Sequence, residues 1–208
     1  SALFRFDLKS GALQAVYPAP ADGAGHELND LTVGPEGSVY SADGNGGVYL
    51  LAPDSKALRL LTPAAALESS QGLALSADGR YLYIADYERG LYAYEFSSGR
   101  LLRLRAPAGV NTYYVDGLVR HGQDLVAIQN AAEPQRVIRF HLDDSGLAIT
   151  AAEVLDSADP LAPEPTLETV VGDRLYLVAN SQWSRFDDAG HLAPKEQLQL
   201  PSIVSLEL

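Results

Sequence analysis

One turn-and-strand unit recurs along the whole chain. A glycine-containing turn followed by an aliphatic or aromatic run occurs four times, beginning at Gly37, Gly79, Gly122 and Gly172. The intervals between these glycines are 42, 43 and 50 residues. Each turn is preceded by a short apolar segment and followed by a segment of alternating character, as expected for strands. A fixed interval of this length restricts the fold to one that arranges similar units side by side.

Each repeat is long enough for four short strands. In the second repeat, strands are expected at 73–75, 81–83, 91–94 and 101–104. Counterparts of the third strand occur at 48–51, 137–140 and 203–206, and residues 3–6 form a further copy. Four short strands in a repeat of about 40 to 50 residues are typical of propeller blades. We therefore predict an all-β fold, a single-domain β-propeller of four-stranded antiparallel blades.

The repeats also give blade boundaries. Complete blades are predicted near residues 28–62, 71–105 and 115–155, with a partial blade at 1–17 and another at 166–208. The proline-rich segment 156–165 reads as a crossover between blades, because the repeat continues after it. Six blades would need about 270 residues, and the first residue is Ser1. We expect the intact protein to be six-bladed, with about four and a half blades present in this N-terminally truncated sequence.

Composition excludes several classes of function. The chain has no cysteine, which excludes thiol catalysis, disulfides and cysteine-bound zinc. Its formal net charge of −12 repels nucleic acid and anionic membranes. No apolar run approaches the roughly 18 residues of a membrane span, so the segment is expected to be soluble. Serine-hydrolase and nucleotide-binding motifs do not occur.

The first strand of every blade lines the central channel of a propeller, so polar residues at the starts of those strands should converge. These residues are Asn29, Asp30, Gln71, Asp116 and Thr166. Oxygen-bearing side chains of this kind suit a hard cation, and calcium is the natural hypothesis. For each residue taken alone, an ordinary role in a turn or strand entry is an alternative.

Three stretches, residues 29–37, 72–80 and 116–118, resemble the gluconolactonase, regucalcin and senescence-marker family of six-bladed propellers, bacterial members included. The resemblance implies a calcium-like divalent ion in the channel. It implies that Asn29 positions the substrate and that Asp116 is both a ligand and the catalytic base. Gln71 stands where the family has an asparagine ligand, and its side chain is one methylene longer. The metal ligands we predict are therefore Asp116, Gln71 and Asn29; the family's glutamate would come from the absent upstream part.

Amides also recur near the ends of the second strands. Gln129, Asn130 and Asn180 are candidate substrate-binding residues, because an amide offers a sugar or lactone both a donor and an acceptor. The alternative is that such amides bind loop backbone at the blade rim. Trp183, with Tyr113 and Tyr114, can stack on a sugar ring at the channel mouth or fill a gap between blades.

Two functions remain open from the sequence. The first is a metal-dependent hydrolase of a lactone or a related small ester or sugar derivative, with Asp116 as the base. The second is a non-catalytic propeller that binds a ligand or a protein, because a fold alone does not fix an activity. The expected partner is a small lactone or sugar-like molecule. The sequence leaves the natural substrate, the oligomeric state and the compartment, bacterial cytoplasm or periplasm, undetermined.

Overall fold

The computed structural model describes residues 1–63, 65–187 and 189–208. In this part of the chain the secondary structure is antiparallel strand with two single-turn 3-10 helices. None of its helices has the length and apolar character needed to cross a membrane. The strands form successive sheets arranged as propeller blades, which confirms the predicted all-β propeller fold.

Three blades have four strands each, hydrogen-bonded in chain order. The first blade contains β3 (Leu28–Val33), β4 (Val39–Asp43), β5 (Val48–Leu51) and β6 (Arg59–Leu60). The second contains β7 (Ser70–Leu75), β8 (Tyr81–Asp86), β9 (Gly90–Glu95) and β10 (Arg100–Arg103). The third contains β11 (Val115–His121), β12 (Asp124–Gln129), β13 (Arg136–Leu142) and β14 (Ile149–Ser157).

The remaining strands lie at the two ends of the chain. A fourth blade has three strands, β15 (Glu168–Val171), β16 (Arg174–Val178) and β17 (Ile203–Glu207). The helices η1 (Trp183–Arg185) and η2 (Lys195–Gln197) lie in the long connection between β16 and β17. A separate hairpin of β1 (Ala2–Phe6) and β2 (Leu13–Pro18) precedes the first blade.

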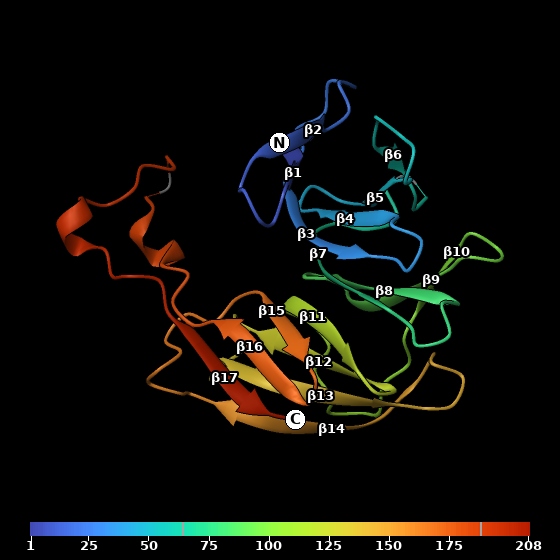
Figure 1. Ribbon diagram of the computed structural model, residues 1–208. Helices are drawn as coiled ribbons and strands as arrows, with labels where there is room; N and C mark the ends of the chain where they lie inside the picture. The colour runs from blue at the N-terminus through green and yellow to red at the C-terminus, as the bar shows by residue number, and fades with distance from the viewer. Residues whose placement is uncertain (64, 188) are drawn as a thin grey trace.

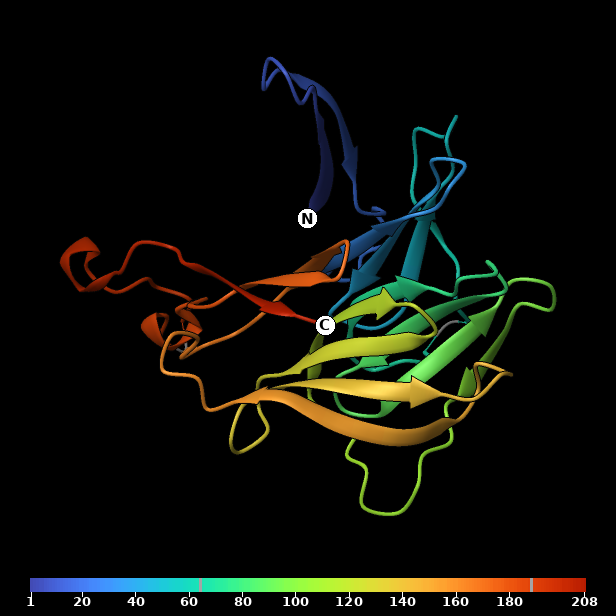
Figure 2. The same cartoon turned by 60° about the horizontal axis from the view of Figure 1, so that its bottom comes forward.

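The blades follow one another around an arc, from the hairpin at the top of Figure 1 to β15–β17 at the lower left. Their first strands are neighbours on the inside of the arc: β3 contacts β7, β7 contacts β11, and β11 contacts β15. Figure 2 shows the same sequence of sheets from another side, with the β16–β17 connection extending away from them. Residues at the starts of the four first strands are thus brought together although the chain separates them widely.

The hydrophobic core lies between the blades. In β8, Tyr81, Tyr83 and Ala85 pack against the third blade, whereas Leu82 and Ile84 pack against the first. Alternate residues of a strand point to opposite faces, so a blade with a neighbour on each side buries both. This explains why all six residues of β8 are buried and why its sequence is almost continuously apolar.

Candidate functional site

A shared irregularity exposes polar side chains at the channel end of three first strands. Leu28 pairs with Asp43 and Leu31 pairs with Ser41, so two residues of β3 lie opposite a single residue of β4. The same shift occurs between Ser70 and Leu73 and between Val115 and Leu118. A β-bulge of this kind leaves a residue outside the ladder and redirects its side chain. The bulged pairs are Asn29–Asp30, Gln71–Gly72 and Asp116–Gly117, which include the channel residues predicted from the sequence.

Asn29 and Asp30 connect the first blade to the second. The side-chain amide of Asn29 donates to Oε1 of Gln71 at 2.8 Å, and Gln71 donates to Oγ of Ser69 at 3.0 Å. The Oδ2 atom of Asp30 accepts the backbone N–H of Leu73 at 3.1 Å. The carboxamide oxygen of Gln71 is therefore directed towards Asn29.

Asp116 is the centre of a second hydrogen-bond network, between the third and fourth blades. Its Oδ2 atom accepts the side-chain amide of Asn130 and the hydroxyl of Thr166, both at 2.6 Å. Asn130 in turn accepts the hydroxyl of Tyr87 from the second blade at 2.8 Å. Within the described residues Oδ1 of Asp116 receives no hydrogen bond and is not among the buried atoms that lack a partner. One carboxylate oxygen is thus held by two hydrogen bonds, and the other has none from the described residues.

Glu168, in the first strand of the fourth blade, completes a group of three carboxyls. Both of its carboxyl oxygens are buried, and neither has a hydrogen-bond partner within the described residues. The carboxyl group lies against Gly117, in the space that a Cβ atom there would occupy. A buried acid without a partner is costly, because the ionised form loses its hydration and gains nothing in return.

Burial raises the pKa of all three carboxyls, and a neighbouring negative charge adds to the shift at Asp30 and Glu168. Burial raises the pKa of Asp30 to about 6, with a further contribution from the negative charge of Asp116. Burial also raises the pKa of Asp116, against the opposing effect of its bonds from Thr166 and Asn130. Burial, followed by the charges of Asp30 and Asp116, raises the pKa of Glu168 well above its usual range. Burial and like charges disfavour the ionised form, so these carboxyls retain their protons to higher pH than exposed acids do.

The side chains at this centre fit a calcium ion in their donor chemistry. Asn29, Gln71 and Asp116 bring carboxamide and carboxylate oxygens from three blades, which are the donors that calcium prefers. The two oxygens of Glu168 are further buried oxygen atoms without a hydrogen-bond partner within the described residues. In the described part of the chain, however, no three acidic or histidine side chains are grouped closely enough to form a metal cage.

Two of the predicted substrate-binding amides lie elsewhere. Gln129 is fully buried, donates to the backbone carbonyls of Asn111 and Tyr113, and accepts from Arg136. Asn180 donates to the carbonyl of Leu200 and accepts from the backbone of Ser202. Both amides hold loops at the rim of a blade, whereas Asn130, next in sequence to Gln129, reaches the channel.

In the first and second blades, an aspartate occupies the position that Gln129 has in the third blade. Asp43 and Asp86 pair with the first residues of β3 and β7, as Gln129 pairs with the first residue of β11. Asp86 accepts the backbone N–H groups of Glu68, Glu88 and Arg89. A buried polar side chain at the end of the second strand therefore ties the loops of every blade together.

A cavity of about 310 Å³ opens beside the Asp116 network. It is formed by loops that follow the second strands of three blades, together with the crossover before β15. Its lining residues are Tyr87, Asn130, Gln135, Glu164, Pro165, Ser181 and Trp183. Asn130 lines this cavity and donates a hydrogen bond to Asp116, so it connects the cavity to the Asp116 network.

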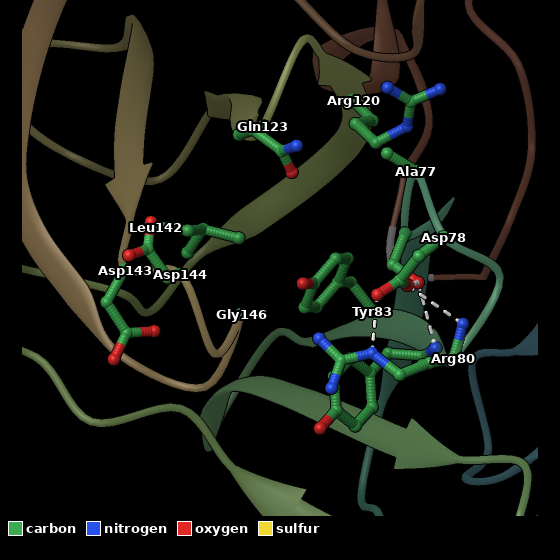
Figure 3. Close-up of a pocket in the computed structure, with 12 residues that line it drawn as sticks. Ala77, Asp78, Arg80, Tyr83, Arg120, Gln123, Leu142, Asp143, Asp144 and Gly146 are labelled. Carbon is green, nitrogen blue, oxygen red and sulfur yellow. Dashed lines mark hydrogen bonds and ion pairs between the residues drawn. The ribbon is translucent and has the colours of Figure 1, made fainter.

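Another cavity, of about 190 Å³, lies at the opposite end of the strands (Figure 3). It is lined by turn residues of the second and third blades, including Asp78, Arg80, Arg120 and Asp143. Arg80 is paired with Asp78, and Arg120 donates to the carbonyls of Leu75 and Gly122. Both arginines of this cavity thus bind groups close to them. The cavity lies at the end of the strands opposite to Asp116.

Sequence reasoning missed Glu168 and Tyr87 as members of the channel network. Glu168 sits in an otherwise uncharged run, residues 167–171, inside the partial blade predicted at 166–208. An acid in such a run was the available signal, because a charge at a core position requires an explanation. Nothing in the sequence around Tyr87 indicated that its hydroxyl reaches Asn130 in the next blade.

Comparison with known proteins places the chain among related sequences. The family model described as SMP-30/Gluconolactonase/LRE-like region matches residues 1–154. No curated protein matches the chain.

Several solved propeller structures are similar. A virginiamycin B lyase from Staphylococcus aureus has a TM-score of 0.60 and 15% identity, over 100% of this chain and 63% of that one. A luciferin-regenerating enzyme has a TM-score of 0.57 and 18% identity, over 98% and 69%. A PQQ-bound aldose sugar dehydrogenase from Streptomyces coelicolor has a TM-score of 0.61 and 16% identity, over 99% and 71%. At these identities the likeness shows the fold alone. The chain spans 63% and 56% of two virginiamycin B lyase chains.

Proposed function

The chain belongs to the SMP-30/gluconolactonase/LRE-like family, and on that premise we propose that it is a metal-dependent hydrolase of a lactone or a related small ester or sugar derivative. The observation that carries the proposal is the Asp116 network. A carboxylate with one oxygen fixed by Asn130 and Thr166, and the other without a hydrogen bond from the described residues, contacts Asn130, which lines a cavity of small-molecule size. A general base needs fixed geometry and access to water.

Asp116 acts on water in this proposal. Its Oδ1 atom, which has no hydrogen bond from the described residues, takes a proton from a water molecule as the water oxygen attacks the lactone carbonyl carbon. The ring C–O ester bond then breaks, and the proton passes from Asp116 to the departing ring oxygen, which gives the hydroxy acid. Burial supports the role, because a raised pKa makes Asp116 a stronger base than an exposed aspartate.

Calcium is the proposed cofactor, with Asp116, Gln71 and Asn29 as the residues that would hold it. When bound, a divalent ion polarises the ester carbonyl and stabilises the charge that develops on its oxygen. Asn29 and Asn130 are the proposed substrate-positioning residues, each with a side-chain amide in the channel network. Gln129 and Asn180 are left out of the proposed substrate contacts, because both side chains are buried and hold loop backbone, whereas Asn130 lines the cavity.

The test is hydrolysis of a panel of sugar lactones by the purified protein, with calcium or with EDTA. Asp116→Ala should lower kcat/KM by roughly 10²–10⁴-fold, the usual contribution of a general base. Asp173→Ala, at an exposed aspartate, is the matched control and should leave kcat/KM unchanged. Equal rates for the wild type and Asp116→Ala would remove Asp116 from the mechanism.

The non-catalytic alternative also has one observation in its favour. Oε1 of Gln71 already accepts a hydrogen bond from Asn29, and Oδ2 of Asp116 accepts from Asn130 and Thr166, so donor oxygens of two proposed ligands are engaged within the protein. Saturable ligand binding without hydrolysis of any lactone, with or without calcium, would favour a binding propeller over the enzyme.

A further inference from the structure

The chain contains a single tryptophan, Trp183, and it lies at the cavity beside the Asp116 network. Its side chain is 65% exposed on η1, in the connection between β16 and β17. The ring of Phe186 supports it, with centroids 5.5 Å apart and the planes tilted by 41°. A large aromatic surface is thus held at the rim of a cavity without being used to fill the core.

The rest of the cavity offers hydrogen bonds of both kinds. Asn130 and Gln135 supply amide groups, and Ser181 supplies a hydroxyl. Glu164 adds a carboxylate, and its Oε1 atom accepts the backbone N–H of Ser184 at 3.2 Å. This bond ties η1 to the crossover before β15, so the aromatic rim and the polar wall are held together.

The charge of the cavity selects against anions. None of its lining residues, all within the described part of the chain, is lysine, arginine or histidine. Glu164 lies in the wall, Asp116 lies behind Asn130, and the whole chain carries a formal charge of −12. A negative potential of this kind repels anionic ligands and tolerates neutral ones.

We propose that this cavity is a recognition subsite for a neutral, hydroxyl-bearing ring, with Trp183 as its stacking platform. The indole face covers the apolar face of the ring, while the amides and the carboxylate bind its hydroxyl groups. A volume of about 310 Å³ lies at the lower end of small-molecule sites, which suits a single ring. The inference rests on the proposed function in one respect: a lactone bound here would have its ester bond turned towards Asp116.

Because Trp183 is the one tryptophan, its fluorescence reports binding directly. The neutral probe is D-glucono-1,5-lactam, which has the ring of a lactone and resists hydrolysis, and the anionic probe is D-glucuronate. The lactam should give a saturable fluorescence change, with an affinity at least tenfold higher than that of glucuronate. Glu164→Gln keeps an oxygen that can accept the N–H of Ser184 but removes the negative charge. It should therefore reduce the difference in affinity between the lactam and glucuronate.

Substitution of the platform provides the decisive comparison. Trp183→Ala should weaken lactam binding about tenfold by calorimetry, the scale of one stacking contact, whereas Trp183→Phe should stay within about threefold of the wild type. Phe4→Ala, at a 59% exposed aromatic on β1, is the matched control and should change nothing. Wild-type affinity in Trp183→Ala, or no saturable signal with the lactam, would overturn the subsite.

The subsite and the hydrolase can fail separately. If the lactam binds through Trp183 and no lactone is hydrolysed, the subsite stands and the proposed function fails. If lactones are hydrolysed with the same kcat/KM by the wild type and Trp183→Ala, the hydrolase stands and the subsite is overturned.

Discussion

Gly117 in the third blade and Glu168 in the fourth share one space: the carboxyl group of Glu168 lies where a Cβ atom on Gly117 would be. The backbone of Gly117 does not have the positive φ that favours glycine. Glycine is therefore required here for close approach between first strands and not for a turn. Through this contact the absence of one side chain allows a third acid to enter the channel.

Gly117→Ala should destabilise the protein by about 2 kcal/mol, because the added methyl overpacks a site next to a neighbouring strand. The free energy of unfolding in urea measures the effect. Gly25→Ala is the matched control, since its Cβ would meet only the amide nitrogen of Asn45, at 3.8 Å. Adding Glu168→Ala to Gly117→Ala should recover part of the loss, and strict additivity of the two changes would contradict the shared space.

Glu168→Gln should make the protein more stable than the wild type at neutral pH. The folded-state pKa of Glu168 lies well above the model value of 4.5, so between these two values the folded state binds more protons than the unfolded state. Stability conferred by the raised pKa is therefore present at low pH and is lost as the pH rises through the folded-state pKa. The advantage of the variant should grow by up to about 1.4 kcal/mol per pH unit in that range.

Urea unfolding of Glu168→Gln and the wild type at a series of pH values above 4.5 gives this comparison. Glu36→Gln, at an exposed glutamate, is the control and should show no such divergence. Parallel stability curves for the wild type and Glu168→Gln would mean that Glu168 is not a buried, proton-binding acid.

The pH dependence of hydrolysis should report Asp116. Its pKa is raised above the model value of 3.8, so kcat/KM should rise with pH through that raised pKa, as the base form appears, and then level off. Thr166→Val removes a hydrogen bond that lowers the pKa, and should therefore move the rising limb to higher pH. If kcat/KM of Thr166→Val rises over the same pH range as that of the wild type, the group that titrates is not Asp116.

Asp86→Ala should be among the most destabilising changes in the chain. The buried carboxylate accepts three backbone N–H groups from two loops, and its removal leaves them unsatisfied. We expect a loss of about 3–5 kcal/mol in the free energy of unfolding. Asp173 has an exposed carboxylate that contacts His121, and Asp173→Ala should lower the free energy of unfolding by less than about 1 kcal/mol. Similar losses for the two variants would refute the role of Asp86 in holding the loops.

The architecture could be read from the sequence because it follows from local periodicity. Alternating side chains and regularly spaced turns are properties of consecutive residues, so the strand predicted at 81–83 is found within β8, Tyr81–Asp86. The polar starts of the first strands were also found, since they occupy the same place in each repeat. Gln129 and Asn130 were not distinguishable, because both follow the same apolar run.

What only the tertiary structure decided is the direction and partner of each polar side chain. A bulge turns Asp116 out of the ladder, and its partner Thr166 is 50 residues away on another blade. Gln129 meets a loop while Asn130 meets the channel, and Glu168 becomes a buried acid because Gly117 leaves room for it. Strand periodicity depends on neighbours along the chain, whereas the charge and shape of the channel depend on how separate blades pack, and a repeat pattern carries no information about that packing.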